Sequence, residues 1–258
     1  MADLTEAVRG ATRDLILVMA DSKRLLGMRY AGWILGAPEL ETGIACASMA
    51  QDEWGHGRLL YALLRDFGED TDRLEHGREA GEYASVEHLD RAPASWPELI
   101  ALNAFVDTAL SVQFEAFRES AWIPLRQRVD KMLEEERFHT AHGAAWIRRL
   151  ATGSDDARAA MRTAAELAVA AMSEWFGPQS GRAADLVSFD VADAMPDELR
   201  SRYLDRSRPL LHALGAEPGA APDFDGFDES RRRSSTAGPD EQTLRQVRGD
   251  KNRAFLMD

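Results

Sequence analysis

The sequence predicts an all-α protein in which four long helices can form a bundle. Apolar residues recur at intervals of three and four along most of the chain, which is the period of an amphipathic helix. Stretches rich in Val, Ile and Thr are scarce, and no Asn-Gly or Asp-Gly turn stands between alternating apolar residues. With 258 residues, 45% of them hydrophobic, the chain can bury a substantial core.

Proline and glycine mark the ends of the predicted helices. Pro38 suits the first turn of the second helix and Gly68 suits its C-cap, while Pro97 suits the first turn of the third. The residues between Gly68 and Pro97 are richer in glycine and are expected to form a looser connection. Helices are predicted, in order, over residues 4–34, 38–67, 97–122, 124–151, 155–175 and 196–214.

The composition changes after Gly215, where Pro, Gly, Asp and Arg become frequent. We therefore predict a helical bundle over residues 1–215 and an irregular C-terminal tail over 216–258, with a short helix near 239–248. The basic run Arg231–Arg233 lies in this tail and is expected to be solvated.

Charge and apolar runs exclude several classes of protein. The net charge of −13 argues against nucleic acid as a partner, because phosphates demand basic patches. No apolar run reaches the 18 or more residues that a membrane span needs, and the N-terminal residues do not resemble a signal peptide. A single cysteine, Cys46, excludes an internal disulfide framework. We expect a cytoplasmic protein that is not bound to a membrane.

Two Glu-x-x-His motifs occur in the chain, Glu53 with His56 and Glu136 with His139. Each lies in the middle of a predicted helix, on the face where apolar residues otherwise recur. The face of the first helix runs through Cys46, Met49, Glu53, His56, Leu60, Leu63 and Phe67, and that of the second through Val129, Met132, Glu136, His139, Gly143, Trp146 and Leu150.

Carboxylates on a buried face need partners, because burying an unpaired one costs several kcal/mol. One interpretation is an internal network of salt bridges and hydrogen bonds. The other is a metal site, because Glu and His three residues apart reach the same cation, and two such helices can hold two metals between them. Carboxylates with two imidazoles suit iron or manganese better than a structural zinc site.

A dinuclear site of this kind also needs a carboxylate from each of two further helices. Asp107 is the candidate in the third predicted helix, where it stands mid-helix on the same face as Ala104, Leu110 and Phe114. Asp is a poor helix former, and this face gives it no contact with solvent. The first helix should supply the last carboxylate.

Several stretches together resemble one family in their order and spacing: "APEL", "QDEWGH", "VD" at 106–107, "EERFH" at 135–139, "MSEWFGP" and "DELRSRYLD". The chain resembles, over about residues 12–230, the phenylacetate-catabolism family that holds the A and C subunits of ring-1,2-phenylacetyl-CoA epoxidase. The resemblance implies a ferritin-like four-helix bundle with extra C-terminal helices. It also implies a non-haem di-iron centre, with two Fe per chain, if the chain is of the catalytic A type.

Residue by residue, the resemblance implies iron-ligand roles for Glu53, His56, Asp107, Glu136 and His139. The chain departs from the catalytic pattern in its first helix. The resemblance implies a sixth ligand, a glutamate ten residues before Trp33, and that position is Lys23, one of only three lysines in the chain. Either the Lys23 ammonium replaces a metal, or it turns away and leaves five protein ligands.

The resemblance implies an oxygenase component of a multicomponent monooxygenase that epoxidises the ring of phenylacetyl-CoA or a related aromatic acyl-CoA. Its partners would be O2, a separate reductase and a homologous ferritin-like subunit. The reductase is needed because the chain has no nucleotide-binding glycine motif and no iron–sulfur cysteine set. The alternative is a non-catalytic scaffold subunit of the same kind of complex, with Lys23 replacing a metal. Iron or manganese storage, or another ferritin-like oxidase, stays open as a third hypothesis.

Overall fold

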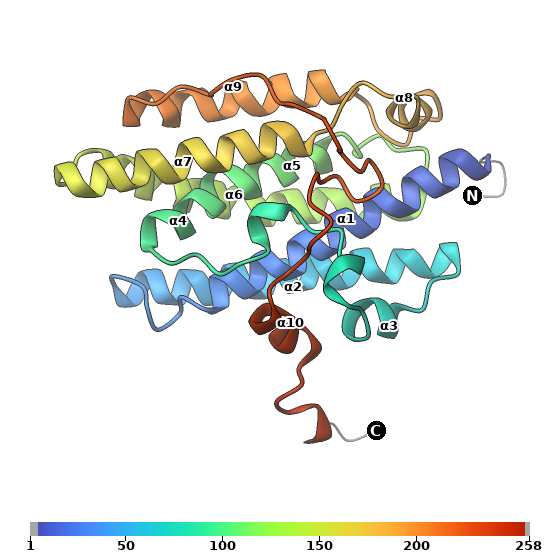
Figure 1. Cartoon of the computed structure of the whole chain (residues 1–258), viewed down its shortest axis with the longest axis horizontal. Helices are drawn as coiled ribbons and strands as arrows, with labels where there is room; N and C mark the ends of the chain where they lie inside the picture. Colours follow the sequence, from blue (N-terminus) through green and yellow to red (C-terminus); the bar gives the residue numbers. More distant parts are fainter. Residues whose placement is uncertain (1–4, 256–258) are drawn as a thin grey trace. The chain divides into compact units, whose positions relative to one another are not determined.

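The computed structural model describes residues 5–255, and the chain divides into two compact units (Figure 1). Of the described residues, 5–12 and 93–225 belong to the first unit, and 13–92 and 226–255 belong to the second. No helix among the described residues is both long and apolar enough to cross a membrane.

The first unit is a layered group of helices. α5 (Asp107–Glu115) packs against α6 (Ile123–Ala151), and α7 (Asp155–Trp175) packs against α6 and against α9 (Pro196–Leu214), as Figure 1 shows. The remaining helices of this unit are α4 (Trp96–Ala101), a π-helical turn (Leu102–Val106) and α8 (Gly181–Ser188).

Side-chain caps and prolines start these helices where the sequence signals predict. The hydroxyl of Ser95 accepts a hydrogen bond from the backbone N–H of Glu98 at the start of α4, and Ser154 caps the start of α7 in the same way. Pro124 and Pro196 lie in the first turns of α6 and α9, where a missing N–H costs nothing. Local chemistry thus determines where the helices that carry the candidate site begin.

The second unit contains most of α1 (Glu6–Ala31) together with α2 (Leu40–Leu64), α3 (Thr71–His76) and α10 (Glu241–Arg248). α1 and α2 approach closely, since a Cβ atom added at Gly27 would lie 2.7 Å from the ring of Trp54 on α2. Short 3-10 turns follow α2 and α3, at Arg65–Phe67, Ala80–Glu82 and Glu87–Leu89, and another lies at Arg253–Phe255.

The all-α class is confirmed: residues 5–255 contain no strand, only an isolated bridge between Asp228 and Arg233, and the fold is consistent with a ferritin-like protein. The helix predicted over 97–122 is instead interrupted by the π-helical turn and ends at Glu115. α3 and α8 were not predicted. Leu4, the predicted start of the first helix, lies outside the described residues. The predicted division of the chain at residue 215 stays a prediction.

The basic run of the tail is not solvated as expected. Arg233 is buried and forms an ion pair with Asp90, and Arg231 donates two hydrogen bonds to the carbonyl of Tyr83. The composition of the tail predicted a solvated run because composition carries no information about contacts between distant segments. In the folded chain, the partners are the carboxylate of Asp90 and the carbonyl of Tyr83, both more than a hundred residues earlier in the sequence. These contacts attach the segment after residue 226 to the rest of the second unit.

Candidate metal centre

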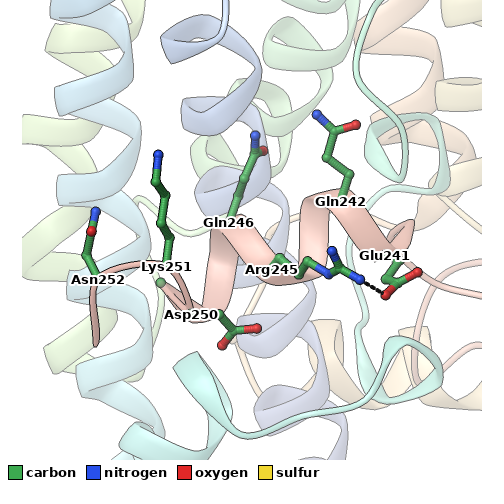
Figure 2. A pocket seen from close by; sticks show the side chains of 8 residues that line it. Glu241, Gln242, Arg245, Gln246, Asp250, Lys251 and Asn252 are labelled. Atoms are coloured by element: carbon green, nitrogen blue, oxygen red, sulfur yellow. Dashed lines mark hydrogen bonds and ion pairs between the residues drawn. The ribbon is translucent and has the colours of Figure 1, made fainter. Parts of the chain in front are cut away.

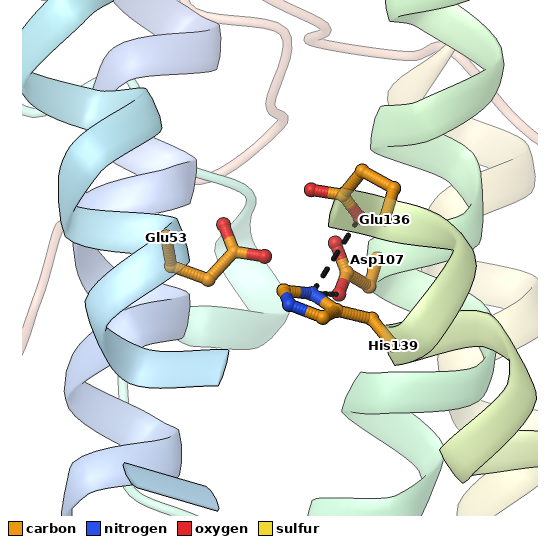
Figure 3. A group of neighbouring side chains, drawn as sticks. All are labelled: Glu53, Asp107, Glu136 and His139. Carbon is orange, nitrogen blue, oxygen red and sulfur yellow. Dashed lines mark hydrogen bonds and ion pairs between the residues drawn. The ribbon is translucent and has the colours of Figure 1, made fainter. Parts of the chain in front are cut away.

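Three of the predicted ligands meet in the first unit. Nδ1 of His139 lies 2.9 Å from Oδ2 of Asp107 and 3.7 Å from Oε2 of Glu136. The ring N–H donates to Asp107, because an ionised carboxylate offers only acceptors. Donor atoms of the three side chains lie within 4.8 Å of one another, and Figure 3 shows the side chains pointing toward one another. All three residues are at most 2% exposed.

The backbone just before Asp107 is a π-helical turn rather than a continuous α-helix. Such single turns are rare in proteins and are found frequently at functional sites. Ser111, one α-helical turn after Asp107, donates a hydrogen bond from its hydroxyl to Oε2 of Glu136 at 3.1 Å. The π-helical turn and α5 therefore place two polar groups against the Glu-x-x-His motif of α6.

Asn103, within the π-helical turn, links the two histidines of α6. Its Nδ2 donates to the carbonyl of His139 at 3.1 Å, so its Oδ1 faces Nδ1 of His142 at 2.9 Å and accepts a hydrogen bond from it. This fixes the hydrogen of His142 on Nδ1 and leaves a lone pair on Nε2. Burial, and then the charge of His139, lower the pKa of His142 below its usual value.

We predict that Gly143→Ala destabilises the first unit by about 1–3 kcal/mol, as overpacking of a filled core does. A Cβ atom there would lie 2.9 Å from Oδ1 of Asn103 and 3.0 Å from Cα of Ala104, so the backbone of the π-helical turn would have to move. Thermal unfolding measures the loss as a lowered Tm.

Gly55→Ala is the matched control, since nothing lies within 4 Å of a Cβ atom added at Gly55. It should leave Tm unchanged or raise it, because alanine favours helix. Equal Tm values for the two variants would contradict the close packing.

The other two predicted ligands, Glu53 and His56, lie on α2 in the second unit. Both are buried, as the apolar face predicted from the sequence requires, with exposures of 0% and 1%. Nζ of Lys23 on α1 donates to Oε1 of Glu53 at 3.0 Å, and neither side chain is exposed to solvent. Glu53, also labelled in Figure 3, is thus one half of a buried ion pair within its own unit.

Asp21, two residues before Lys23, is buried among several hydrogen-bond donors. Its carboxylate accepts hydrogen bonds from the guanidinium of Arg78, from the hydroxyl of Tyr61 at 2.5 Å and from the backbone N–H of Ala84 at 2.8 Å. Burial, and then the charge of Asp21, raise the pKa of Tyr61 well above its usual value. Burial lowers the pKa of Arg78, but the charge of Asp21 and its hydrogen bonds to the guanidinium have the larger effect together. The pKa of Arg78 is therefore raised.

The donor chemistry of Asp107, Glu136 and His139 fits one divalent cation. Two carboxylates balance the charge of such an ion, and one imidazole with carboxylate oxygens suits iron or manganese. The ligand roles of all five residues stay predictions. Ser111 and Asn103 were not among the predicted site residues, although each stands four residues from Asp107, a spacing that places it near the same helix face.

A hollow on the surface of the second unit is lined by residues of α10 and the turn after it. Figure 2 shows Arg245 and Glu241, one turn apart on α10, paired with each other: the guanidinium donates to the carboxylate. It has no histidine or cysteine among its lining residues, so it offers no metal site comparable to that of the first unit. The other lining residues are Gln242, Gln246, Gly249, Asp250, Lys251 and Asn252.

Comparison with known proteins bears on this site. The family described as "Phenylacetic acid catabolic protein" matches residues 1–248. The A component of the 1,2-phenylacetyl-CoA epoxidase of Escherichia coli K12 is 28% identical over 199 residues, which cover 74% of this chain and 63% of that protein. The C component of the same enzyme is 28% identical over 141 residues, which cover 54% of this chain and 57% of that protein. The chain therefore spans about three fifths of the length of each relative.

Proposed function

Because the chain belongs to this family of phenylacetic acid catabolic proteins, we propose that it is the oxygenase component of a multicomponent monooxygenase. The substrate we propose is phenylacetyl-CoA or a related aromatic acyl-CoA, and the reaction is epoxidation of the ring. The observation that carries this proposal is the buried group Asp107, Glu136 and His139, whose donor atoms lie within 4.8 Å of one another.

Iron bound by these residues would supply the activation of dioxygen, which does not react with an aromatic ring unaided. The balance of the reaction is simple. One oxygen atom of O2 enters the ring as the epoxide. The other oxygen atom takes up two electrons and two protons and leaves as water. The electrons require a separate reductase as partner. A homologous ferritin-like subunit is the second proposed partner.

The chain's own residues hold the site rigid and dry. Asp107 orients the ring of His139 through the hydrogen bond to Nδ1, and Ser111 orients Glu136. Phe105, on the π-helical turn, and Met132, one turn before Glu136, are buried and keep water away from this part of the helices. Burial of the ligands strengthens their attraction for a cation, because the local dielectric constant is low.

A scaffold subunit is the second candidate function, and the Lys23–Glu53 ion pair favours it. An ammonium that balances Glu53 removes the need for a metal there. A scaffold would use its helices to hold a catalytic homologue, and metal would then be dispensable for the activity of the complex.

Turnover by the intact complex tests the proposal. The tagged full-length chain is isolated with the proteins that remain bound, loaded anaerobically with ferrous iron, and given reductant, oxygen and phenylacetyl-CoA. We expect consumption of oxygen with the gain of one oxygen atom in the acyl group, measured by mass spectrometry. Acetyl-CoA, which has no ring, is the control substrate and should give no oxygenated product.

The Asp107→Ala variant distinguishes an oxygenase from a scaffold in the same assay. If the chain is the oxygenase, turnover of the Asp107→Ala complex should fall by at least about 100-fold. Mutating a residue that only hydrogen-bonds to a metal ligand already lowers activity by about 10–100-fold, and loss of a ligand should cost more. Full turnover with an assembled Asp107→Ala complex would instead identify the chain as a scaffold. Gel filtration of both complexes establishes that they are assembled.

A further inference from the structure

α2 is apolar on its exposed side as well as on its buried side. A helix at the surface of a protein usually presents charged and polar side chains to water, and a helix that is apolar all round is normally covered. Within α2, all of whose residues the structure describes, the only charged side chains among the exposed ones are Glu41 and Arg58. The exposed side chains form the outer face of α2, and they are Leu40, Glu41, Ile44, Ser48, Gln51, Trp54, Arg58 and Leu59.

The outer face of α2 is large enough to be an interface. Leu40 is 78% and Ile44 is 61% exposed, and the face is about 28 Å long from Leu40 to Leu59 at the rise of an α-helix. The connection just before α2 adds Ile34 and the fully exposed Leu35. Monomers rarely expose a contiguous apolar patch of more than a few hundred Å², and a stable interface buries about 800 Å² on each partner. A second helix laid along this face would cover an area of that order.

The side chains of the outer face match a second copy of the same helix in antiparallel orientation. From either end, the face begins with a leucine and a charged residue, Leu40 with Glu41 at the start and Leu59 with Arg58 at the end. When two copies lie antiparallel, Glu41 of each copy is level with Arg58 of the other. A parallel pair would set like charges side by side, which is unfavourable. A two-fold symmetric contact requires self-complementarity of this kind.

We propose that two copies of this chain form a dimer through the outer face of α2, with the two helices antiparallel about a two-fold axis between Ser48 and Gln51. Burial of the apolar side chains stabilises the dimer, and the opposite charges at the two ends select its orientation. Every residue of this face belongs to the second unit. The dimer goes beyond the proposed function and does not involve the metal centre, so its failure would leave that function as it stands.

Sedimentation velocity of the full-length chain over a range of concentrations measures the association. The wild-type chain should sediment as a dimer at micromolar concentrations. Ile44→Glu should raise the dissociation constant by at least about 100-fold, because it places an unpaired carboxylate in each half of the interface. Leu167→Glu is the matched control: Leu167 on α7 is 56% exposed but belongs to the first unit, so the dimer should persist. Circular dichroism and Tm establish that both variants are folded.

Chemical cross-linking tests the orientation of the two helices. In the antiparallel dimer the two copies of position 51 are offset by only about 4–5 Å along the helix axes, whereas the two copies of position 41 are offset by about 26 Å. A short bis-maleimide reagent should therefore join two chains of the Gln51→Cys variant but not two chains of Glu41→Cys. The wild-type chain gives the background, because its own Cys46 is buried.

The outcomes decide between a second copy and other occupants of the outer face. A dimer that Ile44→Glu dissociates and Leu167→Glu does not, with cross-linking at position 51 and not at position 41, supports the inference. A dimer that survives Ile44→Glu, or a cross-linking pattern other than this one, overturns it. A wild-type chain that stays monomeric by itself also overturns it, including one that uses α2 to bind only a homologous subunit.

Discussion

Glu136→Ala is expected to lower the affinity for ferrous iron or manganese by more than about 100-fold while the chain stays folded. Glu136 provides one of the two carboxylates of the candidate centre. Mutating a residue that only hydrogen-bonds to a metal ligand lowers metal affinity by about 10–100-fold, so loss of a ligand itself should cost more. The hydrogen bond from Ser111 loses its acceptor, but that hydroxyl can rotate toward another one. Anaerobic isothermal titration measures the affinity, and circular dichroism reports the fold.

Glu134→Ala is the matched control for this change. Glu134 has the same side chain two residues earlier on α6 but is exposed, so its loss should leave metal affinity within a factor of two or so of the wild type. Equal affinities for the two variants would show that Glu136 is not a ligand. A Glu136→Ala chain that unfolds would support the alternative interpretation, a buried polar network that holds the helices together.

Arg78→Leu is expected to destabilise the second unit by about 3–5 kcal/mol, the cost of removing one partner from a buried ion pair. Asp21 and Arg78 are 0% and 1% exposed, and the loss of the guanidinium leaves the Asp21 carboxylate buried without its cation. Arg78 also donates to the carbonyls of Leu74 and Glu82, so the segment around α3 should loosen. Urea unfolding measures the free energy of unfolding.

The exposed ion pair in the same segment serves as the control. Arg73 and Glu82 are paired at the surface, where their side chains are 56% and 40% exposed, and Arg73→Leu should cost only about 0–1 kcal/mol. The two variants remove the same kind of group from neighbouring positions and differ mainly in burial. Similar losses from both would mean that the buried pair contributes no more than a surface contact.

Helical periodicity was sufficient to predict the all-α class and the burial of the five candidate ligands. Glu53 and Glu136 are buried because they replace apolar residues at positions that face inward in any packed helix. The spacing of three residues also places Glu136 and His139 on one face of α6, where their side chains meet. These are properties of a single helix, and a sequence determines them without reference to the rest of the chain.

The partners of those residues depend on contacts between distant segments. The π-helical turn, which puts Asn103 and Asp107 against α6, has no sequence signal because it differs from an α-helix by one residue in register. Arg233, expected in solvent, is buried because Asp90 lies 143 residues earlier in the chain and next to it in space.

Lys23 is the clearest example of the difference between what the sequence determines and what the tertiary structure adds. The sequence by itself determined that a lysine stands where the family resemblance implies a glutamate, and left two orientations open for it. Only the tertiary structure shows one of its partners, because α1 packs against α2 so that the ammonium reaches Glu53. The physical reason is that periodicity is a short-range property of one helix, whereas the compensation of a buried charge depends on which other side chain the fold brings within 3.0 Å.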